Sequence, residues 1–409
     1  MGNNKGGSKK NAATTSERGG HKKNAATTSE MTAQTGSPSK YRKNRKDSRD
    51  WRLVIRTRPR ILCLLALLGL FLLCCFVGYQ KWSEKESKGK VGESSPVQVS
   101  FNFTGHSLFV FGDSTVDAGN FGFTAHPYGI DYKGMTPRFT NGRTIADYLA
   151  IKMGTQIPKA YNSLGSDELK DDTVNINFAA GGCGLLTNTM PIRCATMLDQ
   201  VNQMVEARPG NSKGQRVVYF VSAGANDFVF NFNGNPEGFA KELVGKMESY
   251  MEVKALRVNE LLVSRGGART FLINNIGPIG CIPDKSINWS RICNETLNEG
   301  VKAYNMKLVD VLKKFQNDFN VSIILADSDK MFTDMVDHPL QFGLKNITHP
   351  CCGDWNAKDN KFDCRNQTEV CSNRNEFLFF DGAHFTQNAN KVFVDYCILG
   401  RVCYPIESV

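Results

Sequence analysis

Apolar and polar positions follow two alternating patterns after about residue 106. Five short runs are rich in β-branched and aromatic residues and are mostly apolar at successive positions, which is typical of strands buried on both faces. These runs span residues 107–111, 174–178, 216–221, 269–274 and 320–326. Stretches with a helical pattern alternate with them, at residues 143–152, 238–263, 294–319 and 387–398. This order of elements predicts an α/β fold with a parallel sheet covered by helices on both sides.

A different pattern precedes this region: residues 61–79 form an apolar run of 19 residues without a charge. As a helix at ~1.5 Å per residue it would span about 28 Å, close to the hydrocarbon thickness of a bilayer. A cleaved secretory signal is the alternative, but sixty residues precede the run, where such a signal needs a short leading segment. We therefore expect residues 61–79 to be a transmembrane signal-anchor helix.

Charge is concentrated before this run. Residues 1–60 contain sixteen Lys and Arg but four Asp and Glu, whereas the whole chain has a net charge of +10. The remainder is therefore slightly acidic, which argues against a nucleic-acid-binding body. We expect residues 1–60 to be a disordered basic tail, 80–105 a stalk and 106–409 the folded domain. Basic residues stay on the cytosolic side, so the expected topology is type II, with a lumenal or extracellular domain.

Potential N-glycosylation sites lie on one side of the apolar run. All six N-x-[ST] motifs follow it and none precedes it. This distribution agrees with a domain in the secretory pathway. The candidate acceptors are Asn102, Asn288, Asn294, Asn320, Asn346 and Asn366.

Cysteines divide in the same way. Three of the thirteen lie within residues 61–79, ten follow and none precedes them. Ten cysteines in an oxidising compartment predict up to five disulfides, with the pairing left open. Zinc is the alternative for the cluster at residues 351–371, but this cluster lacks the paired CxxC motifs of a zinc site. We expect no metal and no cofactor.

Two short motifs far apart in the chain carry the candidate chemistry. Ser114 follows the first predicted strand, on a turn that we expect to open a helix and to expose the hydroxyl group. His384 has Asp381 three residues before it and a predicted helix just after it. Ser114 as nucleophile, His384 as base and Asp381 as orienting carboxylate would perform acyl transfer. The alternative is that Asp381 and His384 merely cap the last helix.

Residues after the next two strands could stabilise the oxyanion of such a reaction. The Ser114 amide is one candidate donor. Gly181 and Gly182 follow the second strand and offer bare backbone amides, and we favour Gly181. Asn226 follows the third strand and offers a side-chain amide. Each of these residue types is also common in ordinary turns at strand ends.

Taken together, these motifs resemble the four sequence blocks of the SGNH/GDSL hydrolases, and the plant GDSL esterase/lipase branch in particular. The blocks are Gly112-Asp113-Ser114 with Asp117 and Asn120, then residues 177–182, 224–227 and 381–384. Further similar strings lie at residues 127–131, 138–144, 276–283 and 351–353. The resemblance extends from about His106 to Cys403. Phe385 departs from the pattern, because many relatives have proline directly after the histidine.

The resemblance implies a flavodoxin-like three-layer α/β/α SGNH hydrolase fold with a central parallel five-stranded sheet. It implies Ser114, Asp381 and His384 as catalytic residues and Ser114, Gly181 and Asn226 as oxyanion donors. The implied activity is hydrolysis of carboxylic esters in acylated carbohydrates or lipids through an acyl-serine. Together with the predicted anchor, it suggests a cell-wall polysaccharide acetyl esterase of the Golgi or endoplasmic reticulum lumen, or of the plasma membrane. An acyltransferase and a catalytically silent structural glycoprotein are the alternatives.

Overall fold

The computed structural model describes Gly69 and most of the chain from Ser100 onward. The described residues are 100–122, 126–132, 138–190, 194–207, 216–262, 269–286, 292–359, 361–365 and 368–409. The predicted tail, the predicted stalk up to residue 99 and the predicted membrane span, apart from Gly69, lie outside them. Among the described residues, no helix combines the length and the apolar character needed to cross a bilayer.

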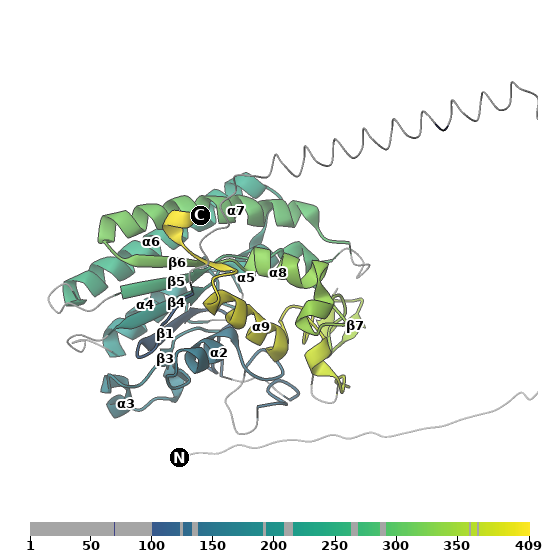
Figure 1. Cartoon of the computed structure of the whole chain (residues 1–409), viewed down its shortest axis with the longest axis horizontal. Coiled ribbons are helices and arrows are strands. Elements are labelled where there is room, and N and C mark those ends of the chain that lie inside the picture. Colours follow the sequence, from purple (N-terminus) through teal and green to yellow (C-terminus); the bar gives the residue numbers. More distant parts are fainter. Residues whose placement is uncertain are drawn as a thin grey trace, which may run out of the picture. The chain divides into compact units, whose positions relative to one another are not determined.

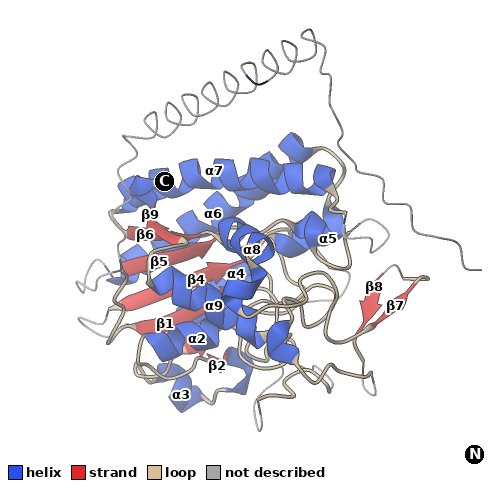
Figure 2. Ribbon diagram, turned by 45° about the vertical axis from the view of Figure 1, so that its right-hand side comes forward, coloured by secondary structure: helices blue, strands red, loops and turns tan. Residues whose placement is uncertain are grey.

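A mixed, mostly parallel sheet forms the centre of the described domain (Figure 2). Its strand order is β2-β3-β1-β4-β5-β6-β9. All neighbours pair in parallel except β9, which runs antiparallel to β6. The strands are β1 Ser107–Gly112, β2 Lys159–Ala160, β3 Ile176–Asn177, β4 Val217–Ser222, β5 Arg269–Asn274, β6 Ser322–Ala326 and β9 Cys403–Pro405.

Helices cover both faces of this sheet (Figure 1). On one face, α4 (Met197–Ala207), α6 (Pro236–Leu262) and α7 (Glu295–Phe319) pack on alternate strand residues such as Phe109 and Tyr219. On the other face, α2 (Ile145–Lys152), α8 (Ser328–Asp337) and α9 (Gln387–Ile398) pack on their neighbours Leu108 and Val218. The α/β fold class and its three layers are therefore confirmed. Successive strand residues are buried on opposite faces, which is why the strands are apolar throughout.

The structure corrects three details of the prediction. The sheet has seven strands in the described residues, not five, because β2 and β9 join it in addition to the five predicted runs. No helix follows Ser114 directly: Val116 and Asp117 donate to the Asp113 carbonyl in a tight turn, and the next helix of the described chain is α2. Helices α4 and α8 were not predicted. The described residues also contain two short α-helices, α3 (Ser166–Lys170) and α5 (Ala225–Asn231).

The structure contains five disulfides, which confirms the number predicted from the ten cysteines and supplies the pairing that the sequence left open. They join Cys183–Cys194, Cys281–Cys293, Cys351–Cys371, Cys352–Cys364 and Cys397–Cys403. The cluster considered as a zinc site thus forms two of them. We call residues 351–371 the cystine lobe; it carries a hairpin of β7 (Asp354–Asn356) and β8 (Lys361–Asp363) that stands apart from the central sheet (Figure 2). Disulfides of this number indicate a secreted or lumenal protein.

The candidate glycosylation sites differ in their surroundings. Asn102 and Asn320 are exposed. Asn294 and Asn346 are half-buried, and their side-chain oxygens accept backbone amides, from Leu297 and from Thr348 and His349 respectively. Asn288 and Asn366 lie outside the described residues. Exposure therefore favours Asn102 and Asn320 as acceptors.

Candidate active site

Ser114, His384 and Asp381 come together at the carboxyl edge of the sheet, from positions 270 residues apart. The Ser114 hydroxyl oxygen lies 2.8 Å from His384 Nε2. On the other side of the ring, His384 Nδ1 lies 2.8 Å from Asp381 Oδ2 and 3.0 Å from Oδ1. This is the spatial arrangement that proton transfer from the serine requires, and it is formed without further movement of the chain.

The turn that carries Ser114 depends on close contact between β1 and β4. Gly112 ends β1 with φ +143°, and a Cβ atom there would overlap the Ser222 carbonyl oxygen. A side chain at position 112 would thus push the two central strands apart. Asp113 then closes the turn: its carboxylate accepts the Thr115 amide at 2.9 Å and the Thr115 hydroxyl at 2.7 Å. Glycine and aspartate here place Ser114 directly past the strand end.

The loop at residues 381–384 is folded around the Asp381 carboxylate. Asp381 Oδ1 accepts the backbone amides of Ala383 at 2.9 Å and His384 at 2.6 Å. The loop is anchored on one side by the Phe380 amide, which donates to the His384 carbonyl, and on the other by Thr386, which caps α9. The Asp-x-x-His spacing therefore lets one turn fix the carboxylate and aim the imidazole.

Charges around the imidazole favour its protonated form. Burial by itself would lower the pKa of His384, but the adjacent Asp381 carboxylate raises it above the ordinary value. Burial would likewise raise the pKa of Asp381. The positive charge of His384 and the hydrogen bonds that the Asp381 carboxylate accepts lower this pKa instead. Asp381 therefore stays ionised and stabilises the imidazolium that forms when His384 takes the Ser114 proton.

Two further acidic residues lie near the imidazole and were not assigned to the site from the sequence. Burial raises the pKa of Asp113 to about 6, despite hydrogen bonds from Thr115. Burial also raises the pKa of Asp284 to about 6, and the neighbouring Asp381 charge adds to this effect. Asp284 accepts the Phe362 amide of the cystine lobe at 2.7 Å. No sequence signal distinguishes these carboxyl groups from ordinary turn residues.

The candidate oxyanion donors are arranged differently from the expectation. The Gly181 amide donates to Asp117 at 2.9 Å, so its single hydrogen is already committed, and this geometry does not support the choice of Gly181. The amides of Ser114 and Gly182, by contrast, have no acceptor among the described residues. Asn226 lies in the first turn of α5, and its side-chain nitrogen donates one hydrogen to the Cys183 carbonyl at 2.8 Å. The second hydrogen of that amide has no acceptor among the described residues.

The described domain has two hollows of opposite character, one with His384 in its wall and the other bordered by Ala180, the residue before Gly181. A mainly apolar cavity of about 100 Å³ has His384 in its wall, together with side chains that include Ile145, Ile276, Ile282 and Phe332. A more polar groove of about 630 Å³ lies beyond Ala180. Its walls carry Asn120, Phe121, Asn162, Asp199, Asn202, Gln203 and Glu206. The two hollows therefore offer a mainly apolar and a more polar surrounding.

Tyr128 is a further residue at the site to which the sequence analysis gave no role. Its hydroxyl donates to Asp381 Oδ2 at 2.6 Å, from a position 253 residues earlier in the chain. The string at residues 127–131 supported the family resemblance, but nothing in its composition indicates that the tyrosine reaches the carboxylate. In the part of the chain that the structure describes, no cluster of His, Cys, Asp and Glu is arranged to hold a metal ion.

Comparisons with known proteins show the family to which the chain belongs. The model of the GDSL-like lipase/acylhydrolase family matches residues 108–397. A GDSL esterase/lipase of Arabidopsis thaliana is 30% identical over 322 residues, covering 70% of this chain and 87% of the relative. The anther-specific proline-rich protein APG of Brassica napus is 30% identical over 319 residues, covering 71% of both chains.

Among solved structures, a carbohydrate acetylesterase of Sinorhizobium meliloti aligns with 13% identity and a TM-score of 0.34, covering 72% of this chain and 95% of that one. The family assignment rests on the sequence matches, which span most of the described domain and both motifs of the site. The chain belongs to the GDSL-like lipase/acylhydrolase family, in its plant GDSL esterase/lipase branch, a family of carboxylic ester hydrolases.

Proposed function

We propose that this protein hydrolyses carboxylic esters with Ser114 as nucleophile, His384 as general base and Asp381 as the orienting carboxylate. The observation that carries the proposal is the continuous set of contacts from the Ser114 hydroxyl to His384 Nε2 and from Nδ1 to Asp381. Family membership supports the reaction class, and the geometry supports these three residues for it.

The reaction proceeds in two halves. His384 takes the Ser114 proton as the serine oxygen attacks the ester carbonyl, and the imidazolium then gives that proton to the departing alcohol. Water, deprotonated by the same imidazole, attacks the acyl-serine and releases the carboxylic acid and free serine. The amides of Ser114 and Gly182 and the free hydrogen of the Asn226 side chain stabilise the negative oxygen in both halves.

Labelling with a fluorophosphonate tests the nucleophile directly. The intact chain should be labelled and lose esterase activity in parallel, whereas Ser114→Ala should show neither labelling nor hydrolysis above background. Serine-independent labelling, or hydrolysis that survives in Ser114→Ala, would refute the assignment. Absence of both labelling and activity in a correctly folded intact chain would favour a silent structural glycoprotein.

For the substrate, we propose an acylated carbohydrate, such as an acetylated cell-wall polysaccharide. The polar groove beyond Ala180 supports a carbohydrate alcohol, because amide and carboxylate side chains beside an aromatic ring suit sugar hydroxyls and ring faces. Acetate release from acetylated xylan should fall in Gln203→Ala, while hydrolysis of a small soluble acetyl ester stays unchanged. Activity on long-chain esters alone would contradict the acetyl proposal.

An acyltransferase remains the alternative for the same acyl-serine. A sugar or lipid hydroxyl would then replace water in the second half of the reaction. Product analysis with and without an alcohol acceptor separates the two reactions. Free acid as the main product in both cases supports hydrolysis, and transfer to the acceptor in preference to water supports the alternative.

We further propose a type II membrane anchor at residues 61–79, with the catalytic domain in the secretory pathway. The length and apolar character of that segment support the anchor, and the disulfides support the compartment. The full chain should stay with membranes in alkaline carbonate, and a chain beginning at residue 92 should not. Glycosidase treatment should reduce the apparent mass through Asn102 and Asn320. Release of the full chain by carbonate would rule out the anchor.

A further inference from the structure

One of the hydrogen-bond donors to Asp381, the Tyr128 hydroxyl, comes from a segment outside the four sequence blocks of the family. Tyr128 lies in the loop before α2, and its hydroxyl donates to Asp381 Oδ2, the carboxylate oxygen that also lies nearest to His384 Nδ1. Burial, followed by the Asp381 charge, raises the pKa of Tyr128. The phenol therefore stays protonated and remains a donor over the whole range in which the enzyme would work.

Aromatic packing fixes the direction of this hydroxyl. The Tyr128 ring meets Phe380 edge-on with centroids 5.4 Å apart, and meets Phe139 with centroids 6.2 Å apart. Phe139 in turn packs on the His384 ring at 5.3 Å. Tyr128 is thus in contact with the residue before Asp381 and, through Phe139, with the imidazole itself.

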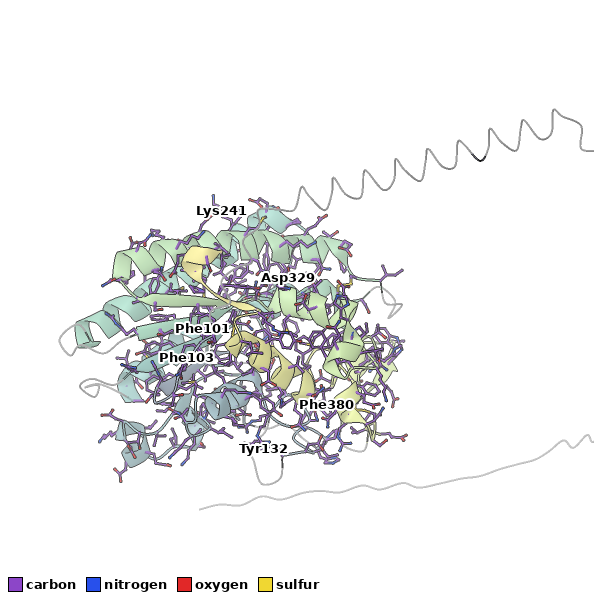
Figure 3. All side chains as sticks on the ribbon, viewed as in Figure 1. Phe101, Phe103, Tyr132, Lys241, Asp329 and Phe380 are labelled. Carbon is purple, nitrogen blue, oxygen red and sulfur yellow. A yellow bond between two sulfur atoms is a disulfide. The ribbon has the colours of Figure 1, made fainter. Side chains whose placement is uncertain are left out.

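The cystine lobe holds the other side of this aromatic group. The Cys352 amide donates to the Phe380 carbonyl at 2.7 Å, and the Cys351 amide donates to the Phe379 carbonyl at 3.1 Å. Tyr128 packs against the buried cluster of Cys351, Cys352 and Phe380 (Figure 3 labels Phe380). The loop that follows Tyr128 is tied to the region just after the lobe, because Arg374 Nε and Nη2 each donate to the Asp131 carboxylate at 2.8 Å.

We propose that Tyr128 is a positioning residue for the triad: its hydroxyl holds the Asp381 carboxylate in one orientation and shares its negative charge, so that Asp381 aligns His384 with Ser114. A hydrogen bond to a charged acceptor is short and strong, and 2.6 Å is within that range. Asp381 Oδ1 is fixed by two backbone amides, and Tyr128 supplies the matching side-chain donor for Oδ2. The proposal rests on the proposed function, since it assigns a role within the same triad.

Removal of this hydroxyl changes charge as well as position. In Tyr128→Phe the full carboxylate charge of Asp381 acts on His384, which stabilises the imidazolium and raises the pKa of the base. His384 must be neutral to accept the serine proton, so the rising limb of the kcat/KM profile moves to higher pH. Asp113 and Asp284 also face the imidazole, and both are unchanged in this variant. Loss of packing alone would lower the active fraction but leave the limb in place.

The test compares Tyr128→Phe with Tyr404→Phe in the full chain, on a small soluble ester. Tyr404 is the matched control. Its hydroxyl also donates a hydrogen bond of 2.6 Å, but to the Arg401 carbonyl next to β9, away from the site. For Tyr128→Phe we expect roughly a 10-fold loss of kcat and a shift of the limb by about half a pH unit to higher pH. Tyr404→Phe should match the parent. Rates are normalised to the serine labelled by fluorophosphonate, so that misfolded protein does not count.

A second measurement keeps the proposal testable if Tyr128→Phe folds poorly. The low-field proton resonance of the His384 Nδ1–H group, compared between the parent and the labelled active fraction of the variant, should move when Asp381 loses its second donor. An unchanged limb and resonance would overturn the role of Tyr128. The Ser114→Ala variant separates this outcome from failure of the proposed function. Hydrolysis that persists in Ser114→Ala would refute the proposed triad as a whole, and not only the role of Tyr128 in it.

Discussion

Asp381 and Asp113 both lie near the His384 imidazole, but the pKa of Asp381 is lowered while that of Asp113 is raised to about 6. Both side chains are buried, with exposed fractions of 5% and 1%. Asp381 receives two backbone amides, the imidazole and the Tyr128 hydroxyl, whereas the donors to Asp113 among the described residues are the amide and hydroxyl of Thr115. The difference teaches that donors and a direct positive partner, and not burial, decide which carboxylate can serve the base.

Replacement of Asp381 should give the largest effect. Asp381→Asn keeps the size of the side chain but removes the charge and allows the wrong imidazole tautomer. We expect kcat to fall by about 10³- to 10⁴-fold on a soluble ester. Steady-state kinetics with an active-site count measure this loss. A loss of less than tenfold would contradict the role of Asp381 as the carboxylate that orients His384.

Opening a disulfide of the cystine lobe tests whether the lobe supports Asp381 through Phe380 and Tyr128. The double variant Cys352→Ala/Cys364→Ala releases a loop of sequence separation 12, which we expect to reduce the free energy of unfolding by about 3 kcal/mol. The limb of kcat/KM should also move toward higher pH, as in Tyr128→Phe, because Phe380 and Tyr128 lose their support. Urea unfolding and a pH profile check both effects. A stability loss with an unchanged limb would separate the lobe from the triad.

Neutralising Asp113 should act in the opposite direction on the base. Asp113→Asn keeps an oxygen that can accept from Thr115, but it removes a negative charge that raises the pKa of His384. We expect the rising limb of kcat/KM to move to lower pH by a few tenths of a unit, following the charge dependence of a nearby base. A shift to higher pH would contradict the electrostatic account of this carboxyl group.

Stability should respond to the same change. The pKa of Asp113 is about 6 in the folded chain against an ordinary 3.8, so the folded state holds this proton more tightly than the unfolded state. The resulting stabilisation is complete below about pH 3.8 and is lost as pH rises through 6. Asp113→Asn should remove this decline, worth up to about 3 kcal/mol. Urea unfolding from pH 4 to 7 measures it, and parallel curves for parent and variant would refute it.

The smallest effect should come from Asp284. It lies against Gly382, with its amide donating to the Gly382 carbonyl at 2.9 Å, and its charge is one of the weaker influences that raise the pKa of His384. Asp284→Asn should move the limb to lower pH by less than Asp113→Asn does. Paired pH profiles of the two variants check the order. A larger shift for Asp284→Asn would place the main electrostatic partner on the lobe side of the ring.

Much of the fold was predictable because each long element carries its own pattern. The strands β1, β4, β5 and β6 and the helices α6, α7 and α9 lie within a few residues of their predicted limits. The two-residue β2 and the three-residue β9 were not predicted. Strand β3 is equally short but lies within the predicted run 174–178, whose residues are all buried. The turn after Ser114 was predicted to be a helix start. The Asp113 carbonyl accepts two backbone amides there, as the first carbonyl of a helix does, but no helix follows.

By itself, the sequence determined the residue types and their local spacing: a serine after a buried strand, a carboxylate three positions before a histidine and ten cysteines after the apolar run. Only the tertiary structure decided which groups meet. It committed the Gly181 amide to Asp117, paired the cysteines and brought Tyr128 to Asp381. Periodicity and turn chemistry act over a few residues and can be read locally, whereas hydrogen-bond partners across 64 to 253 positions depend on how the whole chain packs.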